Sequence, residues 1–156
     1  LIHGGKSTTV YRSGTPMTPL IASLSKALRL SYIDLNKKYD YIKELNNYLK
    51  ANLKKYDKVR INDSSSSIPH ILNFSVLGVK PETLQHALEE YEIYISTQSA
   101  CSTGNVSKAV LALTNDEDRA LSSVRISLSY LTTKEEIDEF IKIFDKGYRE
   151  FLNGKI

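Results

Sequence analysis

The sequence of 156 residues has very few of the residue types that mark special classes of protein. Its one cysteine, Cys101, cannot form an internal disulfide, and three widely separated histidines beside it disfavour a structural zinc site. No apolar run approaches the ~18–20 residues of a membrane-spanning helix. No basic start precedes a short apolar stretch, as a signal peptide requires. These absences predict a cytoplasmic protein with no membrane association and no bound metal.

The composition that remains is that of a folded domain. Hydrophobic residues make up 41% of the chain and charged residues 25%, which excludes disorder and allows one domain with a substantial core. The chain opens with Leu1-Ile2-His3-Gly4-Gly5, and its only methionine is Met17. We therefore expect it to be a piece of a longer polypeptide.

The charge is distributed unevenly along the chain. Residues 1–60 hold 12 lysines and arginines against 4 acidic residues, whereas residues 61–156 hold 9 against 14. A basic half can indicate a nucleic-acid or other polyanionic partner. Here the lysines are spaced among apolar helical positions and no aromatic–basic motif accompanies them, which favours the solvated face of a long helix and makes direct nucleic-acid binding the weaker hypothesis.

The first half of the chain predicts a lead-in followed by helix. Residues 1–19 are rich in glycine, serine, threonine and proline, so we expect an extended segment. No glycine or proline occurs from residue 20 to 68, and apolar residues recur there at helical spacing, first at Leu20, Leu24 and Leu28 and again from Leu35 to Leu53. This pattern predicts one long helix, or two in succession, over roughly 18–55.

The second half alternates short strands with helices. The predicted strands are 59–61, 71–77, 93–97 and 124–129, and the predicted helices begin near Pro81, Val106 and Thr133, the last with a capping-box pattern. This order predicts a small sheet of about four strands with helices on one face, an α/β or α+β sandwich.

Two side chains are candidates for chemistry. Cys101 follows a predicted strand in a polar stretch with glycine and serine, a location that favours an exposed thiol. A single cysteine is more often a small buried residue, and before any resemblance is considered that alternative is the stronger one. Arg125 lies in mid-strand on the side opposite Val124 and Ile126, where its guanidinium could hold a carboxylate in a fork or could simply face solvent.

A third candidate is the run Arg12-Ser13-Gly14-Thr15. Gly14 permits unusual backbone angles, and hydroxyls with backbone amides can cradle a phosphate, although most such tetrapeptides are ordinary turns. None of the histidines at 3, 70 and 86 has a matching partner in the sequence.

Taken together these blocks resemble a known family, the NifS/IscS-like cysteine desulfurases of the class-V, fold-type I pyridoxal-phosphate enzymes. The resemblance covers essentially the whole chain and rests on six blocks in the same order: His3-Gly4-Gly5, Arg12-Ser13-Gly14-Thr15, Ile71-Leu72-Asn73-Phe74-Ser75, Ser99-Ala100-Cys101-Ser102, Ser122-Ser123-Val124-Arg125-Ile126-Ser127-Leu128 and Thr132-Thr133-Lys134-Glu135-Glu136-Ile137-Asp138.

The resemblance implies an activity and a role for each candidate. Such enzymes take sulfur from L-cysteine and leave L-alanine, with pyridoxal phosphate as the electron sink. Cys101 matches the nucleophile that becomes a persulfide and passes its sulfur to an acceptor protein, either a scaffold or a tRNA-thiolation enzyme. Arg125 matches the arginine that binds the substrate α-carboxylate. Thr15 matches the threonine that reaches the cofactor phosphate of the other subunit in a homodimer.

The resemblance also implies what this chain lacks. The lysine that carries the cofactor lies before the His-Gly-Gly block in the family, so we expect the isolated chain to be inactive. Residues 1–19 would then be a lead-in from the large cofactor domain, and residues 20–156 the C-terminal small domain. Residues 6–11 depart from the family's Gly-(Gln/His)-Glu-Arg-Gly run, and Lys6 is no substitute for the missing lysine.

Two alternatives stay open at this point. Other class-V enzymes are aminotransferases or lyases of different amino acids and do not need Cys101. A non-catalytic basic module that docks sulfur acceptors or tRNA would instead use the charge of residues 1–60.

Overall fold

The computed structural model describes residues 3–5, 11–97 and 106–152, with side chains described as far as Glu150. The chain divides into two compact units, residues 1–36 and residues 37–156. The first unit holds α1 (Thr18–Ser31), with Pro19 in its first turn, a place where the missing amide hydrogen is not needed. None of the residues of α1 is buried.

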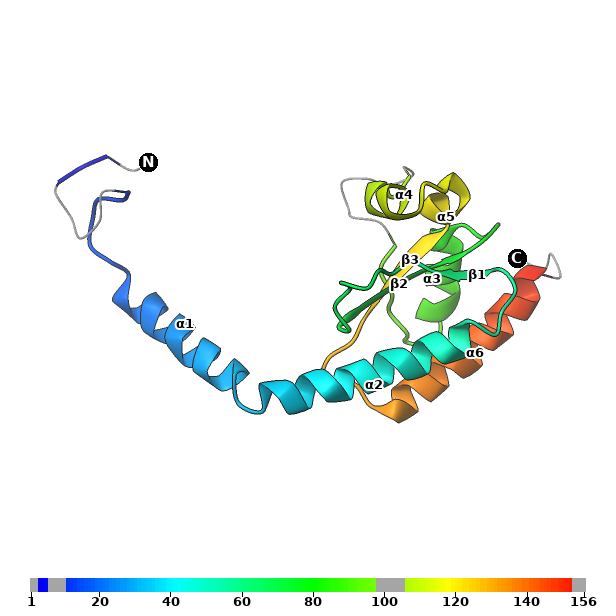
Figure 1. The fold of residues 1–156 in the computed structure, drawn as a ribbon, viewed down its shortest axis with the longest axis horizontal. Helices are drawn as coiled ribbons and strands as arrows, with labels where there is room; N and C mark the ends of the chain where they lie inside the picture. The colour runs from blue at the N-terminus through cyan, green and yellow to red at the C-terminus, as the bar shows by residue number, and fades with distance from the viewer. Residues whose placement is uncertain (1–2, 6–10, 98–105, 153–156) are drawn as a thin grey trace. The chain divides into compact units, whose positions relative to one another are not determined.

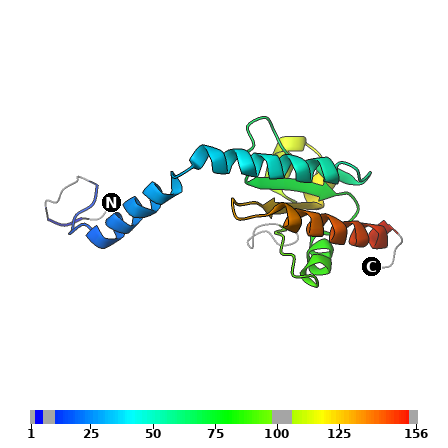
Figure 2. The same cartoon turned by 90° about the horizontal axis from the view of Figure 1, so that it is seen from below.

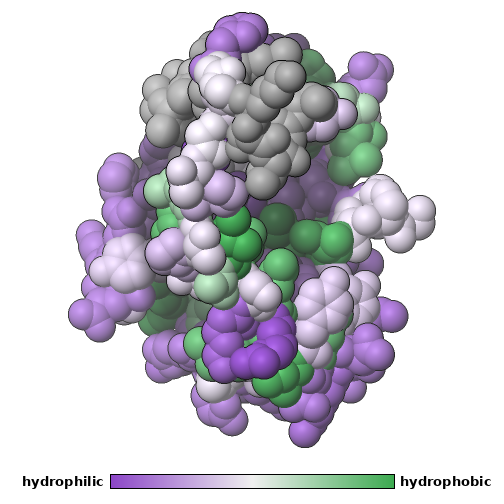
Figure 3. Space-filling model, turned by 90° about the vertical axis from the view of Figure 1, so that its left-hand side faces the viewer, coloured by the Kyte–Doolittle hydropathy of each residue, from purple (hydrophilic) through white to green (hydrophobic). Residues whose placement is uncertain are grey.

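The apolar side of α1 is exposed. Leu20, Leu24 and Leu28 follow one another at four-residue spacing, and each exposes more than half of its surface. Apolar patches between hydrophilic ones are plain on the face shown in Figure 3. An apolar stripe of this kind is typical of a helix that another part of a protein covers.

The second unit contains the remaining elements. They are α2 (Leu35–Leu53), which begins two residues before the unit boundary, β1 (Val59–Ile61), β2 (Ile71–Val76), α3 (Pro81–Glu89), α4 (Lys108–Thr114), α5 (Glu117–Leu121), β3 (Ser123–Ser127) and α6 (Lys134–Leu152). The three strands form an antiparallel sheet in the order β1-β2-β3. In both views α2 and α6 run side by side along one face of this sheet (Figures 1 and 2).

The core lies between that face and the helices. Leu72, Phe74 and Val76 alternate inward along β2, and each exposes at most 1% of its surface. Phe74 meets Phe144 of α6 edge to face, with ring centroids 5.9 Å apart. The other buried apolar residues of this cluster come from α2, β1, α3, β3 and the residue after it, α6, and the segment before residue 98: Ile42, Leu45, Leu49, Leu53, Val59, Leu84, Leu88, Ile95, Val124, Leu128, Ile137, Phe140, Ile143 and Tyr148.

Most of the predicted elements are confirmed. The glycine- and proline-free stretch is two helices in succession, as one of the two predicted forms has it, and the strands at 59–61, 71–77 and 124–129 are present within a residue or two. The break between α1 and α2 comes at Asp34, whose φ of 53° is left-handed. A residue in that conformation cannot continue a right-handed helix, so the chain turns there.

Two features of the predicted architecture are wrong. Within the described residues the sheet has three strands and not four, because the predicted strand 93–97 contributes a single bridge between Ser96 and Arg125. The helices are also not confined to one face. The α4–α5 pair lies over one end of the opposite face, where it covers Ser75, and α5 itself was not predicted (Figure 1).

The predicted capping box at the start of α6 is formed. The Thr133 hydroxyl accepts from the Glu136 amide at 3.2 Å, and the Glu136 carboxylate accepts from the Thr133 amide at 2.8 Å. We expect Thr133→Ala to lower the free energy of unfolding by about 1 kcal/mol, because one amide at the helix start loses its acceptor. Urea denaturation measures this, and Thr133→Ser, which keeps the hydroxyl, is the control. Equal stability of the alanine and serine variants would contradict it.

Candidate functional site

Arg125 lies on the face of the sheet that α2 and α6 leave uncovered. Its neighbour Val124 is fully buried in the core, and alternation along β3 turns the Arg125 side chain to the other side, where it is exposed. This is the position that the strand pattern predicted. The carboxylate-binding role stays a prediction, since the structure contains no ligand.

Ser96 pairs with Arg125 on the side of β3 that faces away from β2. The Ser96 amide donates to the Arg125 carbonyl at 3.0 Å, and the Arg125 amide donates to the Ser96 carbonyl at 2.7 Å. The Arg125 Nη2 also donates to the Ser96 Oγ, at 3.3 Å. The chain that leads into residues 98–105 is therefore attached to the candidate carboxylate-binding residue by both backbone and side chain.

Cys101 lies outside the described residues. After the segment 98–105 the chain is again attached close to β3. The Ser107 amide donates to the Ala120 carbonyl at 3.1 Å, and Ala120 is three residues before Ser123, where β3 begins. The Ser107 hydroxyl also caps α4 by accepting from the Val110 amide. Both described flanks of the cysteine segment are thus hydrogen-bonded either to β3 or to α5, the helix that precedes β3.

Thr15 belongs to the first unit, so its position relative to Arg125 is not described. It follows Gly14, whose φ of 100° is left-handed, and its carbonyl accepts from Arg12 Nη1 at 3.3 Å. The two N-terminal sequence blocks meet here. A Cβ added to Gly4 would lie 2.5 Å from the Ser13 Oγ, so the glycine permits an approach that a larger residue would block.

A polar network that no sequence pattern predicted joins β1, β2 and α5. Arg119 of α5 donates from Nε and Nη2 to the Asn62 Oδ1, at 2.9 and 2.7 Å, and from Nη2 to the Ile61 carbonyl at 2.7 Å. Asn62 Nδ2 donates to Asn73 Oδ1 and to Ser75 Oγ, and Ser75 Oγ donates to the Arg119 carbonyl. Asn62 and Ser75 are buried, so this closed set of hydrogen bonds satisfies groups that would otherwise be costly.

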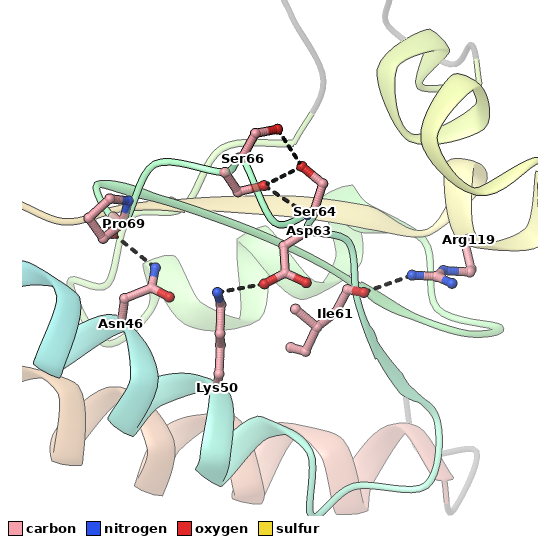
Figure 4. A network of polar contacts seen from close by, with 9 residues as sticks. Asn46, Lys50, Ile61, Asp63, Ser64, Ser66, Pro69 and Arg119 are labelled. Carbon is pink, nitrogen blue, oxygen red and sulfur yellow. Dashed lines mark hydrogen bonds and ion pairs between the residues drawn. The ribbon is translucent and has the colours of Figure 1, made fainter.

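The segment between β1 and β2 is also tied to α2. Asn46 donates to the Pro69 carbonyl at 2.9 Å, and Lys50 pairs with Asp63 at 2.6 Å. Figure 4 shows these contacts on one side of the segment and Arg119 reaching Ile61 on the other. Partners this far apart in sequence leave no local pattern, and only a polar residue at a strand end hints at them.

The described part of the chain also bears on other classes of site. A groove of about 350 Å³ lies beside Ile126 and Phe140, on the core side of β3, and is therefore separate from Arg125. No group of three or more potential metal ligands is found among the described residues. Within the same residues, none of the helices combines the length and apolar character needed to cross a bilayer.

The comparisons with known proteins identify the family. The family described as Aminotransferase class-V matches residues 4–140, and the chain belongs to this family. Two curated relatives are the "NifS/IcsS protein homolog" of Lactobacillus delbrueckii subsp. bulgaricus, 38% identical over 97% of this chain, and the "Cysteine desulfurase IscS" of Buchnera aphidicola subsp. Baizongia pistaciae, 34% identical over 97% of it.

Solved structures agree with this assignment. A "NIFS-like protein" covers 94% of this chain with a TM-score of 0.77 and 29% identity, and the NifS-like protein from Rickettsia africae ESF-5 covers 96% with a TM-score of 0.76 and 28% identity. The chain spans only 38–40% of the length of these relatives and structures. The fold is therefore that of a part of a NifS-like enzyme.

Proposed function

We propose that this chain is the part of a cysteine desulfurase that supplies the sulfur-accepting cysteine and the substrate carboxylate site. The observation that carries the proposal is the contact between Ser96 and Arg125, which joins one flank of the cysteine segment to the exposed arginine of the sheet. The family match and the relatives named cysteine desulfurase support the same reading.

In this proposal Arg125 binds and orients L-cysteine. A planar guanidinium donates two parallel hydrogen bonds to the α-carboxylate, which fixes the substrate's position and its rotation. Ser96 occupies Nη2 on one side, so the remaining N–H groups of the guanidinium are the ones that face the substrate. The rigid sheet behind Arg125 limits the movement of this group.

Cys101 then takes the sulfur. Its thiolate attacks the substrate sulfur, a sulfur–sulfur bond forms, and the substrate carbon–sulfur bond breaks with its electron pair left on carbon. That carbon takes a proton, so the products are L-alanine and a persulfide on Cys101. A second thiol, on an acceptor protein that is a scaffold or a tRNA-thiolation enzyme, removes the sulfur for iron–sulfur cluster or thiolated-tRNA synthesis.

The first unit fits a phosphate group of the cofactor that the family implies. The hydroxyls of Ser13 and Thr15 flank the left-handed Gly14, and Gly4 permits the close approach of Ser13 to the first block. We propose that Thr15 binds the phosphate of pyridoxal phosphate held mainly by the other subunit of a homodimer. When bound, this cofactor supplies the electron sink for the pair left on carbon. In the family, the lysine that carries the cofactor precedes the block that His3-Gly4-Gly5 matches, so we propose that this chain by itself does not catalyse the reaction.

The exposed stripe of α1 supports a larger assembly. Leu20, Leu24 and Leu28 would be costly to leave in water, and the rest of a subunit or its partner would cover them. The boundary at residue 20 between a lead-in and a small domain, and the cytoplasmic location, are part of the same proposal.

The test uses the complete enzyme with L-cysteine. The expected result is a mass gain of one sulfur on the peptide that contains Cys101, with one L-alanine released for each persulfide formed. Since this chain has one cysteine, a persulfide found on it has one possible site. Bound cofactor with neither alanine nor persulfide would instead indicate another class-V reaction.

A further inference from the structure

A row of four polar residues crosses the uncovered face of the sheet next to Arg125. In order across the strands they are Asn62, Asn73, Arg125 and Ser96. The Asn62 amide donates to the Asn73 carbonyl at 2.9 Å, Asn73 is the register partner of Arg125, and Arg125 pairs with Ser96. Residues directly opposite one another on neighbouring strands place their side chains on the same face.

Asn73 and Arg125 form the close type of cross-strand pair. The backbone N–H and C=O of Arg125 are both bonded to Ser96, on the side away from β2, so they cannot also bond to Asn73. In an antiparallel sheet such a non-hydrogen-bonded pair has its Cα atoms only about 4.5 Å apart, with the side chains correspondingly close. The side chains of Asn73 and Arg125 therefore leave the sheet next to each other on the same face.

The orientation of the Asn73 amide follows from Arg119. A guanidinium can only donate, so the Asn62 atom that meets Arg119 must be the oxygen, Oδ1. Asn62 then presents its Nδ2 to the opposite side, where the Asn73 side chain must accept with Oδ1, at 2.8 Å. This leaves both N–H groups of the Asn73 Nδ2 unspent, and they have no hydrogen-bond partner among the described residues.

We propose that Asn73 is a second substrate-binding residue, donating from Nδ2 to the carboxylate that Arg125 binds, and that Asn62 and Arg119 are positioning residues that fix its orientation. The proposal rests on the proposed function, because it takes the ligand of Arg125 to be an amino-acid carboxylate. The guanidinium donates one hydrogen bond to each oxygen of that group, and the adjacent amide donates to one of the lone pairs that remain. An amide rotated by 180° would present an acceptor to the carboxylate, and binding would weaken.

The test compares two ligands that differ only in the carboxylate, L-alanine and ethylamine. Each is titrated into the complete enzyme, and binding is followed by the absorption of the bound cofactor. We expect Asn73→Ala to raise the Kd of L-alanine by about tenfold, the effect of one hydrogen bond to a charged group, and to leave that of ethylamine unchanged. Asn73→Asp, which is the same size but places a second carboxylate there, should raise the Kd of L-alanine further. Equal effects on both ligands, or no effect on either, would overturn the proposal.

The positioning role has its own test in a double-mutant cycle. Arg119→Ala should weaken L-alanine binding in the presence of Asn73 and have no further effect in the Asn73→Ala enzyme, because it acts through that side chain. Arg119→Lys keeps a donor toward Asn62 and should restore most of the affinity, which separates orientation from a loss of folding. If the losses of L-alanine affinity were additive in the double variant, Arg119 would not act through Asn73, and the positioning role would be refuted.

The same titration separates the two proposals. Arg125→Ala tests the carboxylate site that the proposed function requires, and an unchanged preference for L-alanine over ethylamine would count against that site. A lost preference in Arg125→Ala with a normal one in Asn73→Ala would leave the proposed function standing and refute the role of Asn73. The titration measures ligand binding and requires no desulfuration. It would therefore also measure the contribution of Asn73 to carboxylate binding if the enzyme had a different class-V activity.

Discussion

The Cys101→Ser variant of the complete enzyme is expected to form L-alanine from L-cysteine at least about 1,000 times more slowly than the unaltered enzyme. A serine hydroxyl is barely ionised near neutral pH and cannot form a persulfide, so the substrate sulfur has no acceptor. Alanine released per minute, with the mass of the peptide containing residue 101, measures both halves of the reaction. Cofactor absorption should be unchanged, because the proposed function gives Cys101 no part in holding the cofactor.

A matched control lies in the same segment. Ser99→Ala changes a neighbouring hydroxyl and leaves the thiol in place, so alanine should form at close to the normal rate. Normal turnover of the enzyme's substrate in Cys101→Ser would refute the desulfurase and favour a class-V aminotransferase or lyase, in which this cysteine has no chemical role.

Arg125→Ala should raise the KM for L-cysteine by about 100-fold while kcat falls much less. In the proposed site the variant removes two charge-assisted hydrogen bonds to the carboxylate, which would act on the bound substrate and the transition state alike. Steady-state kinetics of alanine formation over a wide range of L-cysteine concentration gives the two constants separately. At saturating L-cysteine the persulfide on Cys101 should still form.

The sheet provides a matched control for the loss of a strand arginine. Arg60 of β1 is also exposed, and its Nη1 donates to the carbonyls of Asp57 and Val59, which are local surface contacts. Arg60→Ala should leave both KM and kcat unchanged. A KM that rises equally in the Arg60 and Arg125 variants would show that loss of any exposed arginine of the sheet, and not loss of the carboxylate site, is responsible.

Local patterns predicted much of the fold and the outer part of the site. The spacing of the apolar residues from Leu35 to Leu53 predicted α2, because the side chains on one face of a helix repeat every three to four residues along the chain. The capping box at Thr133 and the alternation that exposes Arg125 are likewise properties of a few consecutive residues. In each case the interacting groups are close in sequence, so the pattern contains the information.

The parts that were wrong or missed depend on distant partners. The segment 93–97 has strand-forming residues, but only Ser96 pairs with the sheet, through Arg125. Whether a strand extends depends on the neighbour that pairs with it. The short helix α5 covers Ser75 of β2, more than forty residues away in sequence. Such contacts are not encoded in any short stretch of the sequence.

The row Asn62–Asn73–Arg125–Ser96 shows where the division falls. Composition and periodicity were sufficient to predict the strands and the side of β3 on which Arg125 lies. They contained nothing about which strands are neighbours, or about the hydrogen bond from Arg119 that turns the Asn73 amide. The polarity of a side-chain network is set by donors and acceptors that meet across the folded chain, and strand pairing is what brings them together.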